Sequence, residues 1–134
     1  KLIDELKMYK TASEKLLKFV QKHCQNTMDN FGLDFLRVAY SSQLVNPNNE
    51  HVLQDPVRGL YIAVRTIIRE GQESGEFRTD ETADYWTTVV TRSLRGLYFD
   101  WGTGDFDLIS EGQHYFTTFI IKGLSKQCEA ASNI

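Results

Sequence analysis

Three histidines are the first candidates for chemistry, because an imidazole can move protons or bind a metal ion near neutral pH. His23, His51 and His114 lie on different expected elements. None has a second histidine, a cysteine or an acid at the spacing of a metalloprotease-type HExxH helix. The pattern therefore predicts neither a metal site nor a catalytic histidine. His23 lies one helical turn from Phe19, so it could face a pocket and orient a polar group of a ligand.

Motifs for nucleophilic and phosphate chemistry are also missing. The chain has no Gly-x-Ser-x-Gly turn and no Ser-x-x-Lys arrangement suited to an activated serine. The run Gly102-Thr103-Gly104 lacks the Gly-Lys-Ser/Thr that a phosphate-binding loop needs. Asp100, Asp105 and Asp107 flank that run, and helix capping accounts for them better than a hard-metal site does. We therefore expect no enzyme activity, no metal and no cofactor.

Length and composition fit one ordinary globular domain. The chain has 134 residues, of which 41% are hydrophobic and 25% charged, and a chain of this kind can bury a sizeable core. Its net charge of −3 makes the domain as a whole a poor binder of phosphate backbones. Residues 1–30 carry six lysines against four acids, and residues 79–134 carry four basic residues against eight acids. The basic end is either a solvated helical face or the part nearest to nucleic acid.

The two cysteines, Cys24 and Cys128, form no disulfide framework and match no zinc spacing. We expect both to be reduced thiols in a cytoplasmic protein. The sequence shows no signal peptide and no apolar run of membrane-spanning length. Because it starts at Lys1, inside a helical pattern and without Met, we interpret residues 1–134 as a single domain that is a fragment of a longer protein or a chain trimmed at its N-terminus.

Apolar residues recur at helical spacing along the chain, and only Pro47 and Pro56 interrupt it. Gly75 is an expected C-cap, Thr79 an expected N-cap, and Asp105 or Asp107 the cap of the last helix. Sustained strand alternation is absent, so the sequence predicts an all-α fold with five long helices. Their expected ranges are 2–30 (one helix, or two that break near residues 11–13), 33–45, 55–74, 79–101 and 105–127, with a short turn at 49–54.

The last two expected helices, residues 79–127, carry apolar side chains around more of their surface than one core face requires. They also contain interior glycines, each of which costs about 1 kcal/mol relative to alanine. Both features favour close packing against a second copy, in a dimeric four-helix bundle; a monomeric bundle with local irregularities is the alternative. The expected dimer interface consists of Val90, Leu94, Gly96, Leu97, Trp101, Gly112, Phe116, Phe119, Ile120 and Gly123.

The segment from Ile67 to Asp80, IIREGQESGEFRTD, resembles the helix–loop–helix junction of TetR-type transcriptional regulators. The segment from Arg95 to Trp101, RGLYFDW, and residues 108–124 are similar to that family's last two helices. The resemblance covers about residues 56–125 with some specificity, and residues 1–55 only as an arrangement of helices. It implies a TetR C-terminal-domain-like helical bundle that forms homodimers through its last two helices.

In such a regulator an N-terminal helix-turn-helix head binds DNA. This chain contains no such head, so the resemblance implies that it contacts DNA only through the missing part, joined by a helix within residues 1–24. A small, largely apolar effector would bind inside the body and shift that helix, most often in a repressor. The implied effector-binding residues are Phe19, His23, Phe35, Tyr40, Tyr61, Arg65 and Trp86.

Arginine in an apolar helical face is costly unless it is paired, so a buried arginine would mark a polar anchor for the effector. Arg37, Arg65 and Arg92 are the candidates, and Arg65 is favoured because it lies one turn from Tyr61. Plain core packing is the competing interpretation for the aromatic residues. The competing functions are a free-standing helical ligand-binding or scaffold protein without a DNA role, and a helical enzyme with an internal cavity.

Replacing Gly96 or Gly123 by leucine should weaken dimerisation, because a bulky side chain overpacks a contact built for glycine. Light scattering of both variants beside the wild-type chain, at matched concentrations, measures the effect. Unchanged association would place these glycines outside the interface.

Overall fold

The computed structural model describes residues 8–30, 32–45, 54–104 and 107–126. Within these residues the only pairing of extended backbone is an isolated antiparallel bridge between Phe77 and Ser125. The described part of the chain is therefore all-α, as the sequence predicts.

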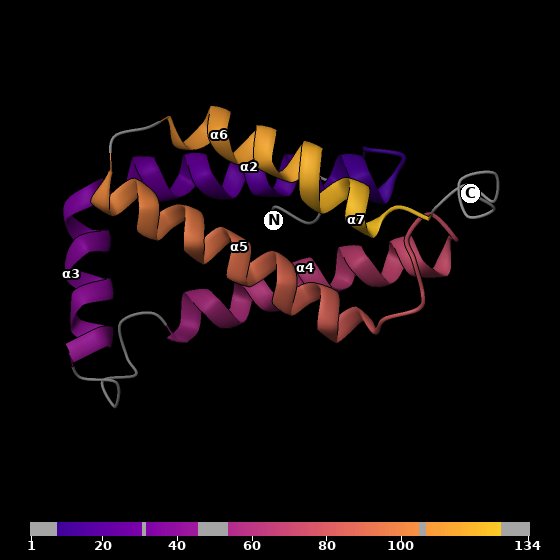
Figure 1. Ribbon diagram of the computed structural model, residues 1–134, viewed down its shortest axis with the longest axis horizontal. Coiled ribbons are helices and arrows are strands. Elements are labelled where there is room, and N and C mark those ends of the chain that lie inside the picture. The colour runs from indigo at the N-terminus through magenta and orange to yellow at the C-terminus, as the bar shows by residue number, and fades with distance from the viewer. Residues whose placement is uncertain (1–7, 31, 46–53, 105–106, 127–134) are drawn as a thin grey trace.

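The helices pack in two layers with one helix across an end. In Figure 1, α2 and the C-terminal helix lie side by side over α4 and α5, and α3 stands across one end of the bundle. The C-terminal helix (residues 108–124) is continuous but is α-helical only at its two ends. The bounds are α2 Ala12–Asn30, α3 Gly32–Val45, α4 Gln54–Glu73, α5 Ala83–Thr103, α6 Leu108–Tyr115, the π-helical segment η1 Phe116–Ile121, and α7 Lys122–Leu124.

Most predicted helix boundaries are confirmed, and one predicted cap is wrong. Gly75 ends α4 with a φ of +85°, the left-handed conformation that favours glycine. The N-cap of α5 is Thr82 rather than Thr79, and its hydroxyl accepts the N–H of Tyr85 at 3.0 Å. Asp80 does not start the helix because its carboxylate is paired with Arg78 at 2.5 Å. Residues 79–82 therefore precede α5 instead of forming its first turn.

The C-terminal helix starts as predicted and ends slightly early. The carboxylate of Asp107 accepts the N–H groups of Ile109 and Ser110, both at 3.1 Å. The helix ends at Leu124, not near residue 127, because Ser125 is extended and bridges to Phe77. The other candidate cap, Asp105, and the predicted turn at 49–54, except its last residue, lie outside the described residues.

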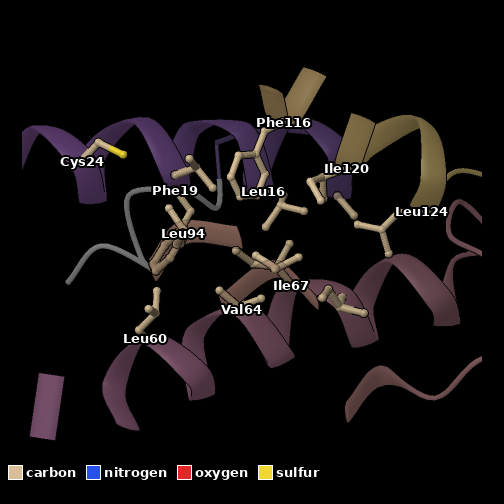
Figure 2. Packing of buried hydrophobic residues seen from close by; sticks show 14 of the residues in the cluster. Leu16, Phe19, Cys24, Leu60, Val64, Ile67, Leu94, Phe116, Ile120 and Leu124 are labelled. Atoms are coloured by element: carbon tan, nitrogen blue, oxygen red, sulfur yellow. The ribbon is translucent and has the colours of Figure 1, made fainter. Parts of the chain in front are cut away.

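The core lies between the two layers. Leu60, Val64 and Ile67 form a buried apolar stripe on α4 and point toward α2 and the C-terminal helix (Figure 2). Leu16 and Phe19 come down from α2 to meet them. Full burial of aliphatic side chains of this size stabilises a fold by roughly 1.5–3 kcal/mol each. The core therefore fixes how α2 sits on α4.

The C-terminal helix buries every fourth residue. Four residues of an α-helix overshoot one turn by about 40°, so an α-helix of this length would carry such a row around to solvent. The π-helical segment has more residues per turn and turns the row back toward the core. The row consists of Leu108, Gly112, Phe116, Ile120 and Leu124, all buried.

The connector between α4 and α5 (residues 74–82) joins α4 to α2 and to the C-terminal helix. The Glu76 carboxylate accepts the N–H groups of Ala12 and Ser13 at 2.8 and 3.0 Å, and so caps α2 from outside that helix. Burial alone would raise the pKa of Glu76, but hydrogen bonds from Ser13 and Ala12 bring the pKa below its ordinary value. The N–H of Arg78 donates to the carbonyl of Leu124 at 2.8 Å. The connector thus ties the start of α2 and the end of the C-terminal helix to α4.

Phe77 of this connector packs directly on Gly71. A Cβ atom added to Gly71 would lie 2.7 Å or less from three carbon atoms of the Phe77 ring, which is closer than atoms can approach. The ring is 1% exposed. Only glycine therefore lets the ring reach the core at this point.

Gly71→Ala should lower the free energy of unfolding by about 1–2 kcal/mol, because the methyl group displaces a core phenylalanine. Gly59→Ala, on the same helix, is the matched control, since its Cβ would meet nothing within 4 Å. Alanine there should be neutral or stabilise by up to about 1 kcal/mol. Urea unfolding of both variants gives the comparison, and two effects of the same sign would contradict the proposed packing.

Candidate functional site

A polar cluster lies inside the apolar contact between α2 and α5. Nδ1 of His23 is hydrogen-bonded to the hydroxyl of Tyr98, which is 4% exposed. The Thr27 hydroxyl donates to the carbonyl of His23 at 2.8 Å and lies 3.3 Å from the Tyr98 oxygen. Helical spacing puts His23 and Thr27 on one face of α2. Two helices thus bring three polar side chains together. We call His23, Thr27 and Tyr98, with the adjacent ring of Phe19, the inner cluster.

The His23 ring is neutral. Burial lowers its pKa from 6.5 to about 4, so Nδ1 can accept the Tyr98 hydroxyl proton. The ring also lies 5.8 Å from that of Phe19 and 5.7 Å from that of Tyr98, centroid to centroid. Burial raises the pKa of the neighbouring Cys24 thiol to about 11, although a Tyr98 hydrogen bond opposes the shift. The cluster therefore offers hydrogen bonds and aromatic faces but no charge.

A second polar group lies at the surface between α4 and α5. Arg65 forms an ion pair with Asp84, and the Tyr61 hydroxyl lies 3.5 Å from the same carboxylate. The Arg65 side chain is 37% exposed. Arg65 is therefore a half-exposed, paired residue rather than a buried anchor.

The other two arginines considered as anchors lie elsewhere. Arg37 is exposed, donates to the carbonyl of Gly102 at 2.7 Å and lies 3.9 Å from the carboxylate of Asp34. It therefore holds the end of α5 against α3. Arg92 is exposed and lines an open groove between α5 and α6.

Trp86 carries a buried polar atom that lacks a partner. Its indole Nε1 is inaccessible to solvent and finds no acceptor among the residues that the structure describes. The ring lies against Gly123, whose added Cβ would be 3.9 Å from it. An unpaired buried donor costs roughly 1–3 kcal/mol, so an acceptor supplied by a bound molecule or water would be favourable there.

The seven predicted effector-binding residues thus fall into separate groups. Phe19 and His23 lie together in the inner cluster, Tyr61 and Arg65 at the surface, and Trp86 against the C-terminal helix. The side chains of Phe35 and Tyr40 lie outside the described residues.

Two members of the inner cluster, Thr27 and Tyr98, were not among the residues predicted from the sequence. Tyr98 reads as one more apolar position of α5. The four-residue spacing of His23 and Thr27 is the signal that could have indicated a polar spot on α2.

The residues predicted for the dimer interface divide into inward and outward sets. Five side chains belong to the core of the chain itself and have almost no surface left for a partner: Val90, Leu94, Trp101, Phe116 and Ile120. Gly112 is also buried, with Cys24 and Leu97 at 3.8 Å from an added Cβ. Gly96 and Phe119 are exposed, and Leu97 and Gly123 are half-buried.

The outward sides of α5 and the C-terminal helix carry a row of exposed aromatic side chains. Tyr85 and Phe99 are 51% and 43% exposed, and Tyr115 and Phe119 are 37% and 65% exposed. The rings of Tyr115 and Phe119 lie 5.6 Å apart. Large exposed apolar surfaces of this kind commonly mark protein–protein contacts. We call these four residues, with the groove between α5 and α6, the outer face.

The described residues contain neither a cluster of metal ligands nor a membrane-spanning helix. Nowhere among them do three His, Cys, Asp or Glu side chains come together as metal ligands would. No helix in this part of the chain has the length and apolar character needed to cross a bilayer.

Comparison with known proteins identifies the protein family to which the chain belongs. The C-terminal domains of TetR-type proteins are regulatory rather than catalytic, and the chain matches a model of one group of them. A family model described as "QacR-like protein, C-terminal region" matches residues 2–126. The chain belongs to that family. Among curated proteins and among solved structures, nothing matches the chain.

The half-buried His23 should make folding stability depend on pH. His23 takes up a proton at a pKa of 6.5 in the unfolded chain but only at about 4 in the folded chain. Its contribution to the free energy of unfolding is therefore fully present above pH 6.5 and is lost as the pH falls toward 4. Between pH 7.5 and 5.5 the loss should be about 1 kcal/mol.

Urea unfolding of the wild-type chain and of His23→Gln at both pH values measures this contribution. The variant should lose less stability than the wild-type chain over that interval. Equal losses in the two proteins would show that His23 is not held neutral by burial.

Proposed function

We propose that this domain binds a small, largely apolar effector at the inner cluster between α2 and α5 and passes the signal to a DNA-binding domain of the same cytoplasmic protein. The observation that carries the proposal is the contact between His23 and Tyr98, a polar pair beside a largely apolar core. Ligand sites typically combine apolar walls with a few polar groups that fix orientation. A neutral imidazole and a phenol suit an uncharged hydrogen-bonding ligand.

The relay follows from how α2 is held. Its first turn is capped by Glu76, Lys15 pairs with Glu70 of α4 at 2.6 Å, and its second half is bonded to α5 through His23. An effector that takes over the hydrogen bonds of His23 and Tyr98 removes the last of these attachments. α2 can then tilt about its capped first turn, which changes the direction in which the preceding segment leads to the DNA-binding domain. The effector acts by favouring the shifted state, which in a repressor is the state that releases DNA.

The working form of this proposal is a homodimer through the outer face. The exposed aromatic residues of α5 and the C-terminal helix supply apolar surface that a second copy would cover. The sensing residue Tyr98 and the outer-face residue Phe99 are neighbours on α5, so one helix serves both tasks.

Nile red, a neutral apolar dye with hydrogen-bond acceptors, is a suitable probe of the inner cluster. It should bind at one saturable site per chain with a blue-shifted emission. Tyr98→Phe should weaken that binding about tenfold, because one hydrogen bond in an apolar site contributes about 1 kcal/mol or slightly more.

Tyr85→Phe is the matched control, since it removes a hydroxyl from an exposed position of the same helix. It should leave the affinity for the dye unchanged. Absence of saturable binding in the wild-type chain would overturn the effector proposal. Equal affinity in the Tyr98→Phe variant would overturn the location of the site.

A further inference from the structure

The outer face carries a row of charges that is complementary to itself. Arg92, Gly96 and Asp100 follow one another at four-residue intervals along α5, and all three are exposed. In the part of the chain that the structure describes, neither Arg92 nor Asp100 forms an ion pair. A half-turn of the row about Gly96 exchanges the arginine position with the aspartate position. A second copy in the opposite direction would therefore meet each charge with its opposite.

Gly96 is also where another helix can come closest. An added Cβ would meet nothing within 4 Å, and a helix surface without a side chain lets a neighbouring backbone approach. Gly96 and Ser93 form the floor of the open groove between α5 and α6, which has a volume of about 820 Å³. Tyr115 and Glu111 line its other side. A glycine in a helix interior costs about 1 kcal/mol relative to alanine, and no contact with the described residues requires this one.

We propose that two copies of this chain cross α5 on α5, in opposite directions, about a two-fold axis at Gly96. Arg92 of each copy pairs with Asp100 of the partner subunit, and symmetry makes that pair occur twice. Rows of residues four apart are the ridges that interlock in the commonest helix packing, which this row fits. The inference rests on the homodimer proposed above and adds its register and the basis of its selectivity.

The charge pair determines which partner is accepted. A chain with the same charge at both positions would place like charges opposite each other, which disfavours the complex. The aromatic residues Phe99 and Tyr115 beside the row supply apolar area but do not distinguish one related chain from another. Recognition of a second copy of this chain thus depends on the order of Arg92 and Asp100 along α5.

Charge reversal tests the crossing. R92D and D100R should each weaken self-association by about tenfold or more, because every interface then contains two like-charged pairs. An equimolar mixture of the two variants should form heterodimers as tightly as the wild-type chain forms homodimers, since both pairs are then attractive. The double variant R92D/D100R should also regain wild-type association. Sedimentation equilibrium of the 134-residue chain, in low salt where exposed charges are least screened, gives the dissociation constants of the wild-type chain, the two single variants, their heterodimer and the double variant.

R69D is the matched control, because it reverses a charge at an exposed position of α4 away from the outer face. It should associate like the wild-type chain. A monomeric wild-type chain would overturn the dimer itself. A dimeric wild-type chain whose single variants associate equally well, or whose mixture shows no preference for heterodimers, would overturn the crossing at Gly96 and leave the dimer standing. Circular dichroism of each variant identifies any loss of helix, and the double variant covers the case in which one single variant fails to fold.

Discussion

The packing of Phe77 on Gly71 closes the bundle, and the other long-range contacts are arranged around it. The ring enters the core where α4 lacks a side chain. Its neighbours in the connector contact two other helices. Glu76 accepts hydrogen bonds from the start of α2, and the N–H of Arg78 donates to the last turn of the C-terminal helix. The segment Gly75–Arg78 lies within Ile67–Asp80, which carries the family resemblance. These residues hold together helices that are far apart in the sequence.

Closing the bundle in this way gives α5 and the C-terminal helix one inward and one outward side. The π-helical segment keeps the row from Leu108 to Leu124 inward, and the same register keeps Tyr115 and Phe119 outward. On α5, Tyr98 points into the inner cluster whereas Gly96 and Phe99 lie on the outer face. In the proposed function, therefore, a change at the effector site acts on the helix that holds two subunits together.

Local sequence patterns were sufficient to predict the fold class and the cap at Gly75, and to limit the cap of the last helix to Asp105 or Asp107, because each depends on local spacing or backbone conformation. They placed the N-cap of α5 at Thr79 instead of Thr82, because both threonines precede acidic residues and local spacing does not reveal the ion pair of Asp80 with Arg78. Nor could they show which apolar side of each of the last two helices faces the core and which faces outward. A pattern of 3.6 residues does not reveal a π-helical segment, so Phe116 and Phe119 looked alike although one is buried and the other exposed. The roles of Gly71 and Tyr98 depend on partners distant in the sequence.

A disulfide cross-link at the proposed two-fold axis tests whether the outer face of α5 meets the same face of a second copy. A cysteine at the position of Gly96, with Cys128 replaced by serine, should give a covalent dimer under mild oxidation at micromolar concentration, because a disulfide requires Cα atoms within about 7 Å. The native Cys24 is buried and free, so it adds little background. Thr66→Cys, at an exposed position of α4, should stay monomeric on a non-reducing gel. Equal cross-linking at both positions, or none at position 96, would contradict the account.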